Sequence, residues 1–150
     1  MEIGFKFEKL IIWQKAMVFG EDIDALTKKF PANELYNLSS QIRRAADSIA
    51  LNISEGSIGQ STLEFKKFMG YAIRSLAEVV TCLHKASKRK YISEIEFNQL
   101  YENAFNLMNM MVAFKKKIQL KRVIISNLRT QLEKTLLTSV FGLPTQIHLS

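Results

Sequence analysis

The feature that most constrains this chain is an alternating spacing of apolar residues that recurs in four separate segments. In residues 12–30, 35–52, 65–86 and 97–118, mostly apolar side chains return at intervals of three and four. Residues at these intervals share one face of an α-helix and form a continuous apolar seam. Four seams joined by short connections predict an all-α fold: an antiparallel up-down-up-down four-helix bundle over residues 1–118.

Proline, glycine and capping residues mark the expected helix ends. Phe30-Pro31 ends the first helix, because proline disfavours helical geometry in the residue before it. The second helix is expected to open at Asn33-Glu34 and to stop at Gly56. Ser61-Thr62-Leu63-Glu64 and Ser93-Glu94-Ile95-Glu96 are capping boxes, in which serine and glutamate satisfy free amides of a first turn. The third and fourth helices should therefore begin there.

The positive charge of the chain is concentrated near its C-terminus. The net charge is +7, and residues 115–150 carry 7 basic residues but 1 acidic residue. Such a region attracts polyanions. Beyond Ile118 the seam weakens, although Ile125, Leu128 and Leu132 can prolong the fourth helix before Gly142. We expect residues 119–150 to be a C-terminal helical extension or a partly disordered basic tail, which packs on another subunit or orders on binding.

A second apolar set lies off the four seams. It consists of Trp13, Met17, Phe68, Ile73, Tyr101, Met108 and Met110. Two interpretations remain open: a wide core stripe accommodates these residues, or exposed members of the set drive self-association.

Composition also excludes several classes of protein. No stretch approaches the roughly 20 apolar residues that a membrane span needs, so no membrane association is expected. The N-terminus has no apolar signal core, and the single cysteine, Cys82, fits a reducing compartment. The expected location is cytoplasmic.

The sequence contains no pattern typical of a catalytic or metal site. Metal-binding bundles use Glu-x-x-His pairs that project inward, and this chain has none. Cys82 and His84 are two residues apart, about 200° around a helix, so they diverge. No glycine-rich phosphate loop follows a strand. We expect no enzyme activity, no catalytic residues, no metal and no cofactor.

A polar stripe flanks the seam of the second helix. It is formed by Gln41, Arg44, Ser48, Asn52 and Glu55, and the third helix offers Ser75 and Glu78 on a similar flank. Polar groups beside a core need partners, so we expect a half-buried network in which Arg44 pairs with Glu55 or Glu78. The stripe either sets the helix register or forms a ligand site.

Residues 35–56 resemble the signature of the four-helix bundle proteins encoded in 23S rRNA intervening sequences. Residues 10–16, Phe30-Pro31, Glu64-Phe65 and residues 75–78 resemble that family's other motifs, in the same order. The resemblance spans about residues 7–118 and implies a homopentameric ring. The related accessory variability determinants of diversity-generating retroelements are basic, bind nucleic acid and associate with a reverse transcriptase. RNA, DNA and such an enzyme are therefore the implied partners.

The leading hypothesis is a nucleic-acid-binding accessory protein that contacts phosphates through basic side chains. The candidate contacts are Arg43, Lys66, Lys67, Lys88, Arg89, Lys90, Lys115, Lys116, Lys117, Lys121 and Arg122. Lysines on outer helix faces are also ordinary solvated surface, and basic helix ends favour the helix dipole. The alternative function is a protein–protein interaction scaffold with no direct role in nucleic-acid binding.

Overall fold

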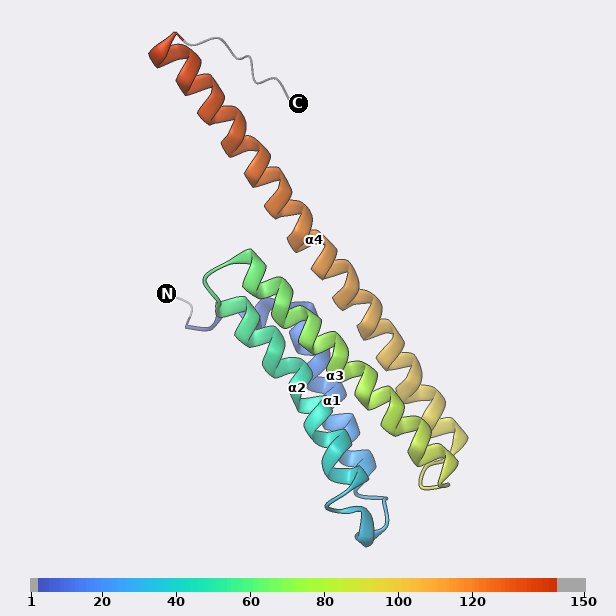
Figure 1. Cartoon of the computed structure of the whole chain (residues 1–150). Helices are drawn as coiled ribbons and strands as arrows, with labels where there is room; N and C mark the ends of the chain where they lie inside the picture. The colour runs from blue at the N-terminus through green and yellow to red at the C-terminus, as the bar shows by residue number, and fades with distance from the viewer. Residues whose placement is uncertain (1–2, 143–150) are drawn as a thin grey trace.

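The computed structural model describes residues 3–142, and within that range it consists of helices without any β-strand. The four α-helices are α1 (Ile11–Thr27), α2 (Leu38–Ile58), α3 (Thr62–Lys88) and α4 (Glu94–Phe141). Two short 3₁₀ helices, Lys6–Lys9 and Ala32–Glu34, precede α1 and α2. Successive helices run antiparallel (Figure 1). The all-α four-helix prediction is confirmed.

The core consists of residues from the four seams. Ile23, Ile42, Ile49, Leu76, Leu83 and Met111 have exposed fractions of 0%. From the second apolar set, Trp13, Ile73, Met108 and Met110 are partly buried against this core. Met17 and Tyr101 stay 43% and 42% exposed. A wide core therefore accommodates only part of that set.

The start of α2 differs from the predicted position. The chain forms a 3₁₀ turn at Ala32–Glu34, and α2 begins at Leu38 rather than at Asn33-Glu34. Leu35, placed on the seam by its spacing, is 46% exposed. The reason is that the Glu34 carboxylate caps the first turn of α2, so residue 34 lies outside the helix.

Gly56 has a different role from the predicted helix stop. It is buried inside α2, which continues to Ile58. A Cβ atom at position 56 would lie 2.8 Å from side-chain atoms of both Phe65 and Phe68. The absence of a side chain at Gly56 therefore lets α3 pack closely against α2.

Both predicted capping boxes lie at helix starts. Ser61 Oγ accepts from the Glu64 amide at 3.1 Å, and Ser93 forms a complete reciprocal box with Glu96. After α3, Lys90 has φ 61°, and the Tyr91 amide donates to the Ala86 carbonyl at 2.9 Å. These are the features of a Schellman ending, in which a residue usually occupied by glycine takes the left-handed conformation.

The fourth helix is much longer than the bundle. α4 has 48 residues and continues without a break past Ile118, the last buried residue of the helix. Residues 119–142 are all exposed, and they project away from α1, α2 and α3 (Figure 1). Residues 119–141 thus extend α4, and Gly142 ends it with φ 61°. The rest of the predicted extension, residues 143–150, lies outside the described residues.

Substituting Gly56 tests the close approach of α2 to α3. Gly56→Ala should lower the free energy of unfolding by about 1–3 kcal/mol, because the two phenylalanines and the backbone must shift. Gly70→Ala is the matched control: there a Cβ meets only Lys115 Nζ, at 3.4 Å. Because Nζ is the end of a flexible chain, this variant should gain about 0.5–1 kcal/mol of helix propensity. Urea denaturation measures both, and equal changes in the two variants would contradict the packing argument.

Candidate nucleic-acid interface

A row of hydrogen bonds joins α2 to α3 along the predicted polar stripe. Ser48 Oγ and Ser75 Oγ are 2.9 Å apart, and Ser75 Oγ also donates to the Tyr71 carbonyl at 3.1 Å. Asn52 Nδ2 donates to Ser48 Oγ at 2.9 Å. Among residues 3–142, every buried side-chain nitrogen or oxygen has a hydrogen-bond partner. Because these polar groups are hydrogen-bonded within the protein, the polar stripe is better suited to setting the helix register than to binding a ligand.

The remaining members of the stripe lie nearer to solvent. Gln41 Nε2 donates to Glu78 Oε1 at 3.3 Å. Arg44 and Glu55 are exposed. Within residues 3–142, the expected ion pair between Arg44 and Glu55 or Glu78 is not formed. Arg44 lies on the outer side of α2, so its guanidinium group remains in water.

The predicted basic contacts do not form one surface. Lys88, Arg89 and Lys90 lie at the C-terminal end of α3, about 33 Å along the helix from Lys66 at a rise of about 1.5 Å per residue. Arg89 is held by Glu34 at 3.0 Å. Arg43 pairs with Asp24 at 3.6 Å. Lys116, Lys117 and Lys121 are exposed and point in different directions around α4.

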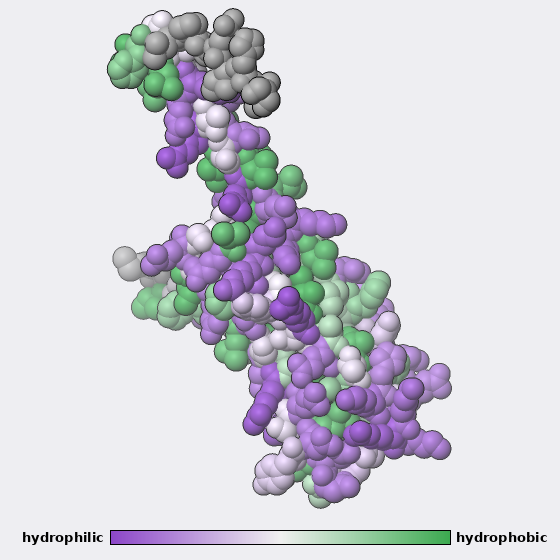
Figure 2. Space-filling model, in the orientation of Figure 1, coloured by the Kyte–Doolittle hydropathy of each residue, from purple (hydrophilic) through white to green (hydrophobic). Residues whose placement is uncertain are grey.

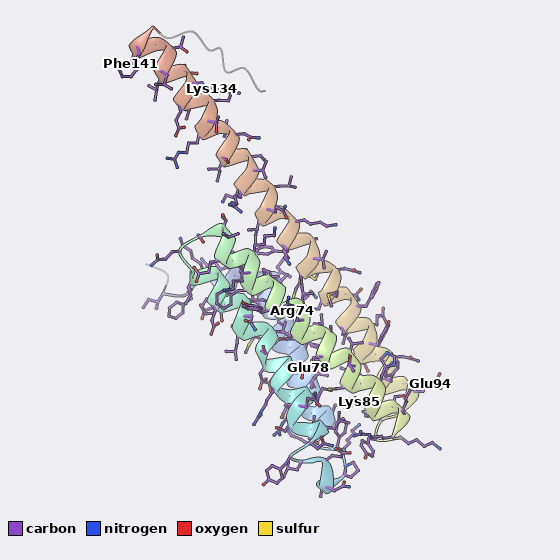
Figure 3. The ribbon with its side chains drawn as sticks, viewed as in Figure 1. Arg74, Glu78, Lys85, Glu94, Lys134 and Phe141 are labelled. Carbon is purple, nitrogen blue, oxygen red and sulfur yellow. The ribbon has the colours of Figure 1, made fainter. Side chains whose placement is uncertain are left out.

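Part of the predicted set does come together, where the N-terminal half of α3 lies beside α4. Lys66, Lys67 and Lys115 line a hollow of about 810 Å³ together with Arg74 and Tyr71. Lys66 also lines an adjoining hollow of about 240 Å³, together with Arg122 of α4. We call Lys66, Lys67, Arg74, Lys115 and Arg122 the α3–α4 basic surface. Arg74, labelled on α3 in Figure 3, is exposed.

Local structure adds to the positive potential of this surface. Ser61 and Thr62, at the N-terminus of α3, lie on its edge. A helix N-terminus carries a partial positive charge from its free amides. Glu64 also lines the larger hollow, but it is engaged with the backbone amide of Gln60 at 3.1 Å.

Sequence reasoning missed Arg74 and Tyr71 as members of this surface. Lys67 Nζ lies 5.8 Å from the centre of the Tyr71 ring, which is a cation–π distance. Lys67, Tyr71 and Arg74 are spaced by four and three residues, so they share one helix face. That spacing is visible in the sequence, but the approach of Lys115 from α4 is not.

A buried carboxylate was also missed. Glu34 is 7% exposed and accepts four hydrogen bonds. Arg89 Nη1 at 3.0 Å and Tyr91 Oη at 2.9 Å donate to one oxygen. Asn37 Nδ2 at 2.8 Å and the Leu38 amide at 3.2 Å donate to the other. These donors, chiefly the Leu38 amide, lower the pKa of Glu34 although its burial opposes the shift.

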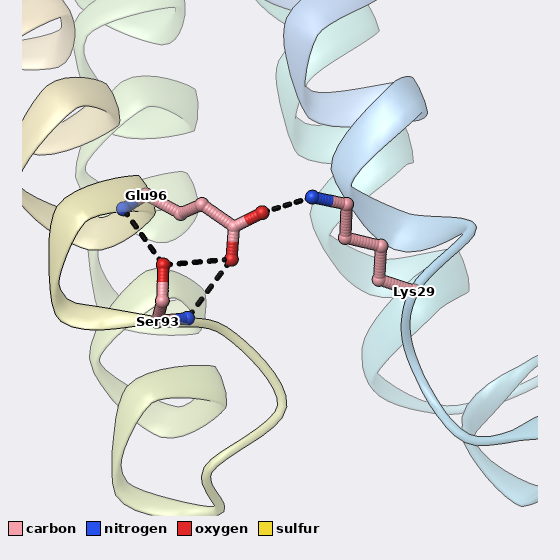
Figure 4. Close-up of polar contacts among 3 residues, drawn as sticks. All are labelled: Lys29, Ser93 and Glu96. Carbon is pink, nitrogen blue, oxygen red and sulfur yellow. Dashed lines mark hydrogen bonds and ion pairs between the residues drawn. The ribbon is translucent and has the colours of Figure 1, made fainter.

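A second carboxylate ties α1 to α4 at the same end of the bundle. Lys29, just after α1, donates to Glu96, which also accepts from the Ser93 amide at 2.9 Å and the Ser93 hydroxyl at 3.0 Å (Figure 4). The Lys29 contact first, and then the Ser93 donors, lower the pKa of Glu96 to about 2. The capping box of α4 therefore also links α4 to the end of α1.

Comparison with known proteins identifies the family. The model of the 23S rRNA-intervening sequence protein family matches residues 8–113. The chain belongs to this family. The family match covers the predicted motifs from residue 10 to residue 78 and ends before the projecting part of α4. No curated protein sequence matches the chain.

A solved structure of similar fold is a protein of unknown function from the S23 ribosomal protein family of Bacteroides thetaiotaomicron. It aligns with a TM-score of 0.65 and 23% identity, over 71% of this chain and 99% of that chain. At this identity the likeness supports only the fold of the present chain. The alignment leaves about 29% of the present chain (100% less the 71% covered) without a counterpart in that structure.

Among residues 3–142, no three histidine, cysteine or acidic side chains come together as a metal site would require. His84 packs edge-on to Phe97 at 4.9 Å, and Cys82 is buried. No helix of the described residues is long and apolar enough to cross a membrane.

The lowered pKa values of Glu34 and Glu96 predict a loss of stability in acid. The stabilisation from each carboxylate is fully present above the ordinary value of 4.5 and is lost as pH falls below it, and for Glu96 the loss extends to a pH of about 2. The melting temperature of the wild type should drop steeply across this range, and the drop should be smaller in Glu96→Gln. Glu102→Gln, at an exposed position without a side-chain hydrogen bond among residues 3–142, is the control. Parallel curves for all three proteins would contradict the assignment.

Proposed function

We propose that this chain is a non-enzymatic, oligomeric accessory protein that binds RNA or DNA through the α3–α4 basic surface. The observation that carries the proposal is the convergence of five basic side chains from two helices over adjoining hollows. All five are free of ion pairs within residues 3–142, so they are available to phosphates. The N-terminus of α3 adds to their attraction.

Phosphate contacts, rather than base recognition, should dominate the binding. Each neutralised phosphate releases condensed counterions, so affinity falls as salt rises, with a slope of about −0.9 per contact on duplex DNA. Five contacts per subunit correspond to a slope of about −4 to −5. The Tyr71 ring has Lys67 over its face, which leaves little aromatic area for stacking on bases. We therefore expect weak dependence on sequence.

Charge reversal at the two ends of α3 tests this surface. Lys66→Glu/Lys67→Glu should weaken binding to a fluorescent DNA duplex and a structured RNA by about 10-fold or more, and should flatten the salt dependence. Lys88→Glu/Lys90→Glu makes the same change in charge at the other end and should have a much smaller effect. Fluorescence anisotropy at about 50 and about 200 mM salt measures both.

Two results would overturn the proposed surface. Equal losses in the two double variants would mean that net charge alone determines binding. No binding of the wild type at low salt would remove nucleic acid as a partner and favour the interaction-scaffold alternative. The exposed apolar side chains along the projecting part of α4 are the observation that supports this alternative.

We also propose that the oligomer is a homopentamer, as the resemblance to the ring-forming family implies. Repetition of the basic surface in a ring would let several weak phosphate contacts act together. Light scattering after gel filtration should give five times the 17.2 kDa mass of the chain. A monomer at micromolar concentration would exclude the ring and its multiplied charge.

A further inference from the structure

The projecting part of α4 has an apolar face that no other part of residues 3–142 covers. Leu128, Leu132 and Leu136 are 58%, 64% and 60% exposed. Figure 2 shows apolar side chains along this segment with no other described element over them. Lys134 and Phe141 mark its outer part, away from the bundle (Figure 3). In proteins, most of the stability of a helix comes from the packing of its apolar face against other elements.

These side chains form a stripe that continues the core seam of α4. Inside the bundle the seam consists of buried or partly buried residues that end with Leu107, Met111, Phe114 and Ile118. At 100° per residue, the same face then carries Ile125, Leu128, Leu132, Leu136 and Val140. We call these five residues the α4 stripe. The face that α3 covers in the bundle is thus repeated beyond the bundle without a cover.

The bundle of the same chain cannot supply the cover. α4 is one unbroken helix from Glu94 to Phe141, so its outer part cannot fold back on its own bundle. The α4 stripe runs for about 22 Å at a rise of about 1.5 Å per residue, and α1 is about 25 Å long. A groove along α1 therefore has a suitable length.

One such groove lies on the bundle between α1 and α2. It has a volume of about 470 Å³ and a predominantly apolar lining that includes Trp13, Met17 and Leu51. Met17 and Leu51 are 43% and 59% exposed. Its charged lining residues are Glu21 and Asp47, with no lysine or arginine. Within residues 3–142, neither carboxylate makes an ion pair or a hydrogen bond.

The charges of the stripe helix complement this groove. Residues 119–141 carry Lys121, Arg122, Arg129 and Lys134, and their one acid, Glu133, is paired with Arg129 at 2.9 Å. Two projecting helices paired with each other would bring like charges together, which is unfavourable. The other long groove, between α1 and α4, is lined by Lys15 and Asp22, so it offers no net charge.

We propose that the α4 stripe of one copy docks into the α1–α2 groove of a second copy of this chain. The inference rests on the proposed homo-oligomer and specifies one of its interfaces. Two different surfaces meet, so the contact is heterologous, and repetition of such a contact generates a ring when the rotation closes. The stripe lies beyond residues 8–113 of the family match, so this interface is an addition of this chain to the family fold.

The first experiment compares two faces of the projecting helix in the full chain. Leu128→Asn/Leu136→Asn should raise the concentration at which half of the protein is assembled by about 10-fold or more, as measured by light scattering. Val123→Asn/Leu137→Asn changes two residues that are each 50% exposed on another face, and it should leave assembly unchanged. An assembled Leu128→Asn/Leu136→Asn variant with wild-type mass would overturn the docking but not the oligomer. A wild-type monomer would overturn both, whereas nucleic-acid binding is measured separately.

The second experiment locates the receiving groove. Single-cysteine additions Leu128→Cys, Leu132→Cys and Leu136→Cys are each mixed with Leu51→Cys, at the rim of the α1–α2 groove, and oxidised. The native Cys82 is 1% exposed and stays in every variant. A disulfide between the mixed partners supports the proposal. The stripe variants are also mixed with Val18→Cys, at the rim of the α1–α4 groove. The proposal would be overturned if the stripe variants link only to themselves, if they link to Val18→Cys instead, or if no mixture links.

Discussion

The close contact between α2 and α3 organises the rest of the molecule. Gly56 lets two phenylalanines of α3 approach the α2 backbone, and the Ser48–Ser75 hydrogen bond holds the two helices in register. These two helices form the most extensive pair in the bundle, α1 packs on α2, and α4 packs on α3. Among the adjacent helix pairs, α1 and α4 contact each other least. Grooves beside α1 are a consequence of that arrangement.

Polar contacts restrain the end of the bundle where α1 connects to α2 and α3 connects to α4. Glu34 joins the start of α2 to Arg89 and Tyr91 after α3, and Glu96 joins the start of α4 to Lys29 after α1. Each carboxylate satisfies backbone amides as well as side chains, which lets Glu34 remain charged while buried. The opposite end has fewer such restraints, and there the basic surface and the projecting helix lie.

The functional proposals assign separate surfaces to separate partners. The α3–α4 basic surface faces solvent beside α3 and suits phosphates, whereas the α4 stripe and the α1–α2 groove suit each other. Arg122 precedes the stripe on α4 and lies at the edge of the same helix face. Lys66, Lys67 and Arg74 belong to α3, which takes no part in the proposed docking. Family membership is compatible with both proposals and specifies neither.

The sequence by itself determined the four helices, their antiparallel order and most of the core, because these depend on local spacing, capping and proline. The seams of α1 and α3 and the capping serines lie where the spacing predicts them. It also predicted the polar stripe of α2 and four members of the basic surface. Only the tertiary structure decided that Gly56 is a packing site rather than a stop, since the cause lies in Phe65 and Phe68 of another helix.

The tertiary structure also decided which charges act together. Glu34 takes partners 55 and 57 residues away, and Arg44 faces water although its spacing placed it beside the core. The basic residues near both ends of α3 look equivalent in the sequence, yet only those near its start meet Lys115. Helix periodicity specifies which face a residue occupies. The neighbour that this face meets depends on how the helices pack.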